Sequence, residues 1–215
     1  MALTYPLSLA SYFDTLLIAE FEPDLTEALT GGETGGGEAI SSDYGPRLWQ
    51  ARLVASRSSL PKAARSVALT ESLRRAGTSF FATDPLRRYP QADPDGSLLG
   101  GAAPSITSVA SNNRDVTLGG LPASYVLTPG DLIAWDYDTS RRAMHRIVVG
   151  ATANGSGVAT IELEPFVRGT PAGASVDLID PSCKAKILTG SYSPRTLTRR
   201  GGSGFSFIWR QTLAP

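Results

Sequence analysis

Apolar and polar residues alternate with a period of two along much of this chain, which is the spacing of β-strands that bury one face. The alternation begins in residues 16–22, returns in residues 48–54, and is sharpest at Phe205, Phe207 and Trp209. Six more short candidates, separated by turns rich in Gly, Pro, Asn and Asp, lie at residues 105–109, 115–118, 132–135, 143–149, 158–163 and 176–179. The pattern predicts a mainly β protein.

Residues 60–76 are the one segment whose sequence predicts an α-helix. Ser59 offers a capping hydroxyl, Pro61 fits the first turn, and Gly77 supplies a left-handed stop. The apolar residues fall on two sides of this helix, with Ala63, Ala64 and Val67 on one side and Leu69, Leu73 and Ala76 nearly opposite. We therefore expect one surface to pack on the chain's own sheet and a second to remain for a neighbour.

The order of these elements predicts two units. Composition shifts to Gly, Pro, Asp and Ala in residues 91–104, which is typical of a domain boundary. Residues 104–181 then hold the strands of a small antiparallel β-barrel module. Residues 182–215 are too few to form a domain, so their amphipathic strand is expected to pair with the sheet of residues 1–92. The expected fold is a split, β-sandwich-like domain with one helix and an inserted β-barrel module.

Residues 31–37 read Gly-Gly-Glu-Thr-Gly-Gly-Gly. A phosphate-binding loop would continue into Gly-Lys-Ser or Gly-Lys-Thr, and the surrounding residues here are acidic, which repels phosphate. Glycine-rich turns also connect paired strands. The segment therefore predicts the tip of a hairpin.

Charge is unevenly distributed along a chain whose net charge is zero. Residues 1–46 hold eight acids and no Lys or Arg, whereas residues 47–88 hold nine bases and two acids. The two blocks either neutralise each other across adjacent strands or face each other between copies, head to tail, in a closed ring. The second interpretation makes Arg52, Arg57, Arg65, Arg74, Glu20 and Glu22 candidate inter-subunit contacts.

The sequence shows no pattern typical of an enzyme, a metal site or a cofactor site. One Cys and one His exclude a structural zinc site within one chain. The one histidine, His145, lies on a strand and is expected in a core or an interface. Glu162 and Glu164 share a strand face, where acids are commonly only solvated. We expect no catalytic residues and no cofactor.

Targeting and nucleic-acid signals are also missing from the sequence. The N-terminus has no basic run before an apolar segment, and no apolar run is long enough to span a membrane. The arginines lack the interleaved aromatic residues and the overall basicity of a nucleic-acid-binding protein. We expect a soluble protein made in the cytoplasm, without a membrane anchor and without specific nucleic-acid binding.

Two groups of motifs, which together cover residues 58–90 and 129–180, resemble the minor tail proteins of bacteriophages. The first comprises Leu73-Arg74-Arg75-Ala76-Gly77, Ser79-Phe80-Phe81 and Asp84-Pro85. The second comprises Pro129-Gly130-Asp131-Leu132-Ile133, Gly157-x-Ala159-Thr160-Ile161, Pro165-Phe166-Val167-Arg168 and Pro171-x-Gly173. The class that they resemble most is the distal tail protein, although a hub component or another minor tail protein would share these strand patterns.

The resemblance implies a ring, generally of six copies, at the distal end of the tail tube. The partners that it implies are the tail tube protein and the baseplate hub protein, in a virion tail that is assembled in the host cytoplasm. It implies no catalytic residues. The alternative is a virion-associated module that recognises host carbohydrate, for which Trp135, Asp136, Tyr137 and Asp138 offer aromatic and acidic side chains.

Overall fold

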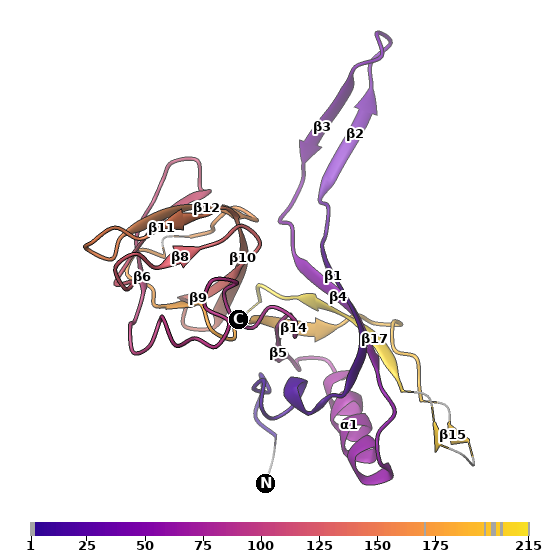
Figure 1. Ribbon diagram of the computed structural model, residues 1–215. Helices are drawn as coiled ribbons and strands as arrows, with labels where there is room; N and C mark the ends of the chain where they lie inside the picture. Colours follow the sequence, from indigo (N-terminus) through magenta and orange to yellow (C-terminus); the bar gives the residue numbers. More distant parts are fainter. Residues whose placement is uncertain (1–2, 170, 196, 199–200, 203, 215) are drawn as a thin grey trace.

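The computed structural model describes residues 3–169, 171–195, 197–198, 201–202 and 204–214. These residues form two larger antiparallel sheets and one α-helix (Figure 1). The first sheet has five strands in the order β1 (Ile18–Leu25), β4 (Trp49–Ala55), β17 (Ser206–Gln211), β14 (Cys183–Ile187) and β5 (Phe80–Ala82). Strands from both ends of the chain therefore share one sheet. The predicted pairing of the last strand with the N-terminal sheet is confirmed, with Ile208 opposite Arg52.

The second sheet has six strands in the order β13 (Val176–Asp177), β9 (Leu132–Asp138), β10 (Arg141–Val149), β12 (Ala159–Glu164), β7 (Asp115–Gly119) and β6 (Ser105–Val109). The mainly β prediction is confirmed, and the strands lie close to their predicted positions. The predicted barrel is wrong, because the edge strands β6 and β13 are not joined by a ladder. They are linked only by the isolated bridge between Ser105 and Ser175 and by backbone hydrogen bonds around it, such as that from the Ile106 N–H to the Ala174 carbonyl.

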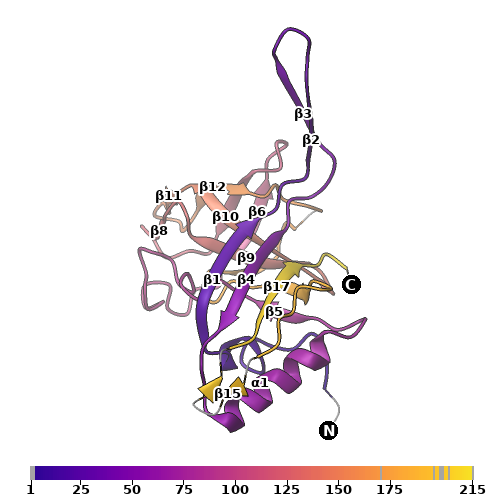
Figure 2. The ribbon, with the colours of Figure 1, turned by 90° about the vertical axis from the view of Figure 1, so that its right-hand side faces the viewer.

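Three pairs of short strands complete the described structure. β8 (Val126–Leu127) pairs with β11 (Ala151–Thr152), and β15 (Leu197–Thr198) pairs with β16 (Gly201–Gly202). β2 (Leu29–Glu33) pairs with β3 (Ala39–Asp43) in a hairpin that projects from the ends of β1 and β4, away from both larger sheets (Figures 1 and 2). No helix among the described residues is long and apolar enough to cross a membrane.

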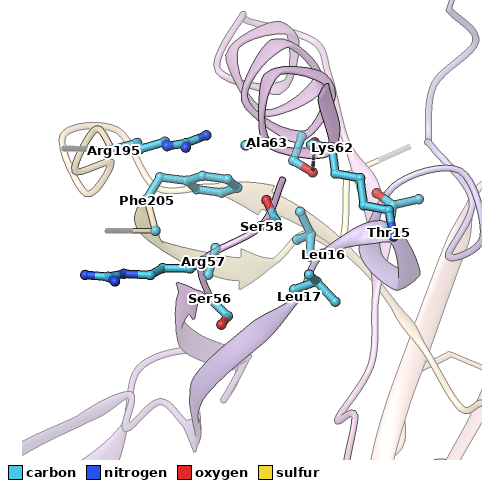
Figure 3. Close-up of a pocket in the computed structure, with 13 residues that line it drawn as sticks. Thr15, Leu16, Leu17, Ser56, Arg57, Ser58, Lys62, Ala63, Arg195 and Phe205 are labelled. Atoms are coloured by element: carbon cyan, nitrogen blue, oxygen red, sulfur yellow. Dashed lines mark hydrogen bonds between the residues drawn. The ribbon is translucent and has the colours of Figure 1, made fainter. Parts of the chain in front are cut away.

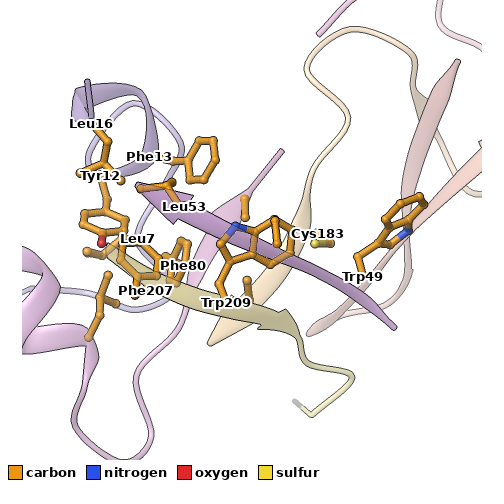
Figure 4. Close-up of a cluster of buried hydrophobic side chains, with 14 of the residues drawn as sticks. Leu7, Tyr12, Phe13, Leu16, Trp49, Leu53, Phe80, Cys183, Phe207 and Trp209 are labelled. Atoms are coloured by element: carbon orange, nitrogen blue, oxygen red, sulfur yellow. The ribbon is translucent and has the colours of Figure 1, made fainter. Parts of the chain in front are cut away.

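The core of the five-stranded sheet follows from the alternation in its strands. Leu53 and Phe207 are buried side by side in the register of β4 and β17, whereas Arg52, the residue before Leu53, faces solvent. The short helix η1 (Phe13–Thr15) and the residues around it cover this face, so that Tyr12 and Phe80 meet edge to face (Figure 4). Aromatic side chains thus supply much of the buried area of this sheet.

The helix α1 (Leu60–Leu73) packs on this core and ends three residues earlier than predicted. Its cap differs from the prediction, because the Ser59 side chain makes no capping hydrogen bond. Gly77 has a φ of +81° but lies four residues beyond Leu73, so it shapes the turn after the helix, and Arg74 rather than a left-handed residue is the C-cap. The predicted division of apolar faces is partly wrong, since Ala63 and Leu73 are both buried against the body while Ala64 is exposed.

A buried hydrogen bond ties α1 to the N-terminal segment. The Thr70 hydroxyl donates to the Ser66 carbonyl at 2.7 Å, so the Tyr12 hydroxyl, 2.8 Å from Thr70 Oγ1, is the donor to Thr70. Burial raises the pKa of Tyr12, which remains a neutral donor. This bond fixes how the helix lies over the sheet.

The two sheets share an apolar boundary. Leu132, Ala134 and Met144, from β9 and β10, belong to the core cluster of the five-stranded sheet. The indole N–H of Trp49 donates to the Met144 carbonyl at 2.7 Å, and the Arg146 guanidinium lies 4.8 Å from the Trp49 ring. The β9–β10 hairpin therefore contributes to both cores.

The segment of residues 91–104, predicted as a domain boundary, is exposed at most positions but is anchored by a few buried residues. Asp93 is fully buried and accepts hydrogen bonds from the backbone N–H groups of Leu98 and Leu99 and from the Tyr125 hydroxyl. Leu99 is part of the core of the six-stranded sheet. Because a buried carboxylate is retained only when hydrogen-bonded, these three donors explain how an acid anchors this loop.

Candidate assembly surfaces

The hairpin of residues 29–43, which we call the arm, has no core of its own. All ten residues of β2 and β3 are exposed. Its tip is closed by the Gly37 N–H donating to the Thr34 carbonyl, and Gly37 has a φ of +83°. The predicted hairpin tip is confirmed, with Gly31 and Gly32 lying within β2 rather than in the turn.

The two faces of the arm differ. Ile40, which is 60% exposed, lies opposite Gly32, and Thr30 lies opposite Ser42 on the same face. The large apolar side chain of Ile40 is thus surrounded by small residues. The space opposite it is open, because a Cβ added at Gly32 would meet nothing within 4 Å. Residues 27–43 also hold four acids and no base, namely Glu27, Glu33, Glu38 and Asp43. The arm is acidic and carries two exposed large apolar side chains, Ile40 on one face and Leu29 on the other.

A basic pocket lies where β4 ends and α1 begins (Figure 3). Three cationic side chains from different segments line it: Arg57 after β4, Lys62 in the first turn of α1, and Arg195 in the C-terminal segment. No acid lines the pocket, and no ion pair of these three side chains is found among the described residues. Phe205 forms part of its wall (Figure 3).

An apolar groove continues from this pocket along the outer side of α1. The two hollows share Ala63 and Arg195. The groove is lined on the helix by Leu60, Ala64 and Val67, with Glu71 and Arg74 towards the end of the helix, and on the other side by Tyr192 and Pro194. Leu60 is 70% exposed. We call the pocket and the groove together the α1 groove.

The candidate contacts predicted from charge lie in different surroundings. Arg52 pairs within its own chain with Glu22 at 3.2 Å and Glu20 at 3.7 Å, across β1 and β4. These three side chains therefore neutralise each other across adjacent strands of one chain, which is the first of the two interpretations given above. Each exposed pair contributes less than about 1 kcal/mol to stability. Arg57 lines the basic pocket, as described above.

The two remaining candidates lie on α1 or at its end. Arg65 is exposed on the helix, and Arg74 stacks over the Tyr192 ring at 4.4 Å, at the end of the α1 groove. Arg195 was missed at the sequence level, because only the path of the C-terminal segment brings it to α1. Whether any of these residues contacts another subunit stays a prediction.

The outer face of the five-stranded sheet changes sign from one edge to the other. Asp24, Gln50, Arg210 and Lys186 form one cross-strand row over β1, β4, β17 and β14. The edge strand β1 also carries Glu20 and Glu22 on this face. The sheet is therefore acidic along β1 and basic along β14.

The arm is anchored at its base by a bridge to the other sheet. Arg47 Nη1 lies 2.8 Å from Glu164 Oε1, and Arg114 lies 3.7 Å from the same carboxylate. The Glu164 carboxylate is therefore paired with two cationic side chains. Its neighbour on the strand face, Glu162, pairs in register with Asp115 rather than facing a cavity.

The buried surroundings of Trp135 weigh against the carbohydrate site considered above. Trp135 is fully buried and stacks on His145 at 4.3 Å with an interplanar angle of 9°. Sugar platforms need an exposed ring face, so the expectation that Trp135 supplies one is wrong. The predicted core position of His145 is confirmed, with 3% of its surface exposed.

The described residues contain no group of three or more His, Cys, Asp and Glu side chains that could hold a metal ion. No family model matches the sequence, and no curated protein matches it. The surfaces described above are therefore the basis for a functional assignment.

Proposed function

We propose that this chain is a structural subunit that assembles with copies of itself. In view of the resemblance described above, the proposed assembly is a ring at the distal end of a bacteriophage tail tube, generally of six copies, that connects the tube to the baseplate hub. The observation that carries the proposal is the arm. It is a two-stranded hairpin that projects from the body and is covered by no other part of the described chain.

An isolated two-stranded hairpin is at best marginally stable in water, because each strand lacks a sheet face to pack against. The arm adds an exposed Ile40, an exposed Leu29 and, just after β3, a 73% exposed Tyr44. Burial against another surface would stabilise both the apolar side chains and the hairpin itself. A neighbouring subunit is a source of such a surface.

The charge distribution of the five-stranded sheet supports side-by-side packing of identical copies. Its acidic β1 edge and basic β14 side are complementary, so each copy can present one to the next. Backbone pairing at β1 is disfavoured by Pro23 and by the acids along the strand. At the other edge, Leu7 already pairs with β5 through the backbone of Ser79 and Phe81. Side chains rather than an added strand would therefore join the copies.

The test compares the full chain with an arm-shortened variant. Leu29 and Asp43 are direct partners in the hairpin register, so residues 30–42 can be replaced by Asn-Gly, which forms a two-residue turn. Light scattering should give a multiple of the subunit mass for the full chain, and negative-stain images should show rings. The shortened variant should be monomeric with an unchanged urea-unfolding midpoint. A full chain that stays monomeric at every protein concentration would refute the proposal.

A further inference from the structure

We propose that the arm of one copy binds the α1 groove of the next copy. This inference rests on the proposed self-assembly and assigns the two surfaces that meet in it. The occupant is a second copy of this chain, and the argument for it is complementary charge and shape between two unpartnered surfaces of the same molecule.

The arm cannot reach the groove of its own chain. It leaves the sheet at the end of β1 and the start of β4, whereas the α1 groove begins after the last residue of β4. The seven residues of β4 place these two points about 20 Å apart. The arm also points away from α1 in both perpendicular views (Figures 1 and 2). Any contact between these surfaces is therefore between copies.

The charges of the two surfaces are opposite. The basic pocket has Arg57, Lys62 and Arg195 and no acid in its lining. The arm has three acids, Glu33, Glu38 and Asp43, and no base, and Glu27 precedes it. Two of these acids, Glu33 and Glu38, flank the turn at the tip, which is the part that extends farthest from the body (Figure 1). Carboxylates at the tip can thus meet the cations at the base of α1.

The spacing of apolar residues also fits. Ile40 is two residues from Glu38, which is about 7 Å along a strand. The α1 groove likewise passes from the basic pocket directly into the apolar part formed by Leu60, Ala64 and Val67. With Glu38 in the pocket, Ile40 lies over the apolar part. Gly32 opposite Ile40 lets the helix approach the arm closely.

This contact joins two different surfaces and is therefore heterologous. Repetition of a heterologous contact gives a ring when the rotation between copies closes and an open filament when it does not. The contact also orders the arm, since the hairpin acquires an apolar surface that its own chain does not supply.

Disulfide trapping tests the contact directly. One preparation carries Gly35→Cys at the tip, where a Cβ meets nothing within 4 Å, and the other carries Ser58→Cys in the lining of the pocket. The native Cys183 is fully buried, so it does not compete. Mixing under oxidising conditions should give a covalent dimer on a non-reducing gel. Gly35→Cys mixed with Ser156→Cys, an exposed turn position, is the control and should give none.

Two matched pairs of variants test the chemistry of the contact. Arg57→Glu with Lys62→Glu should weaken assembly about tenfold or more, whereas Arg75→Glu with Arg141→Glu, which changes net charge equally at two exposed positions outside the α1 groove, should leave it within about twofold. Ile40→Glu should abolish assembly, whereas Ser41→Glu, on the opposite face of the arm, should be tolerated. Equal effects of the two members of either pair would overturn the inference.

The outcomes separate the inference from the proposed function. A full chain that is monomeric refutes both. Assembly that requires the arm but resists Arg57→Glu with Lys62→Glu, and that gives no disulfide between Gly35→Cys and Ser58→Cys, overturns the inference alone, since the arm then binds elsewhere. The inference is supported if the disulfide forms between Gly35→Cys and Ser58→Cys and if assembly is weakened both by Arg57→Glu with Lys62→Glu and by Ile40→Glu.

Discussion

Acidification should destabilise this protein through His145. The imidazole Nδ1 lies 2.6 Å from the Pro165 carbonyl oxygen, which only accepts hydrogen bonds, so Nδ1 carries the proton of the neutral ring. Nε2 is buried and has no partner among the described residues. A second proton would therefore create a buried charge with an unpaired N–H. Burial lowers the pKa of His145 to about 4, and the positive charge of Arg168 acts in the same direction.

The sign and size follow from proton linkage. The unfolded chain takes up a proton near a pKa of about 6.5, whereas the folded chain does so only near a pKa of about 4. The contribution of the neutral His145 ring to the free energy of unfolding is thus fully present above pH 6.5 and is lost as pH falls towards 4. Between pH 7.5 and pH 5 the loss is about 2 kcal/mol.

The assay is urea unfolding of the wild type and His145→Gln at pH 7.5 and pH 5. The amide of Gln can donate to the Pro165 carbonyl but does not titrate, and the carboxylates common to both proteins cancel in the comparison. The wild type should lose about 2 kcal/mol more than the variant between the two pH values. An equal loss in both proteins would contradict the assignment of His145 as a buried neutral base.

Three further predictions concern the packing between and within the sheets. Trp49→Phe removes the indole donor to the Met144 carbonyl and should lower the free energy of unfolding by about 1–3 kcal/mol in urea titrations, since the carbonyl remains buried. Cys183 is fully buried and its pKa is raised to about 12 by burial, so it should be unreactive towards a thiol reagent at pH 8 and react once urea unfolds the chain. Glu164→Gln should weaken the link between Arg47 and β12 and cost about 1 kcal/mol or less, measured by thermal unfolding at low and high salt.

Local periodicity explains what the sequence predicted well. Phe207 and Trp209 alternate with polar or half-buried neighbours, and a strand of this kind must place one face in a core. The strand of residues 48–54 has the same alternation, and the two strands pair. The helix was predictable because Pro61 and Gly77 bound a segment without strand alternation. These are properties of neighbouring residues, which a sequence displays directly.

Contacts between distant segments explain the errors. The run Leu132-Ile133-Ala134-Trp135 is apolar without interruption because β9 is buried on both faces. Leu132 and Ala134 face the core of the five-stranded sheet, while Ile133 and Trp135 face the core of their own. Four consecutive apolar residues could have indicated this, and would have removed Trp135 as a sugar platform. Asp93 was likewise hidden in a Gly- and Pro-rich segment, since one of its donors, Tyr125, lies 32 residues away.

The shared boundary between the sheets bears on the prediction that residues 104–181 fold alone. Removing the five-stranded sheet would expose Leu132, Ala134 and Met144 to water. Autonomy of this unit stays a prediction, and its test is a cooperative melt of the isolated fragment. The strands of the unit pair only with one another in the second sheet and in the β8–β11 pair, which favours independent folding, whereas the exposed apolar strip favours association.

The two interpretations of the charge separation apply to different residues. Two acids of β1, Glu20 and Glu22, lie beside Arg52 and are partly neutralised within the chain, whereas Asp24 lies opposite the uncharged Gln50. The acids of the arm lie between the end of β1 and the start of β4 and form no ion pair among the described residues. A coreless hairpin gains little stability from three acids that lack cations, because like charges on adjacent strands repel. Selection for monomer stability alone would favour mixed charge on this arm. The acidity of the arm is therefore explained best by a basic surface on another copy, and the pocket of Arg57, Lys62 and Arg195 has the matching sign.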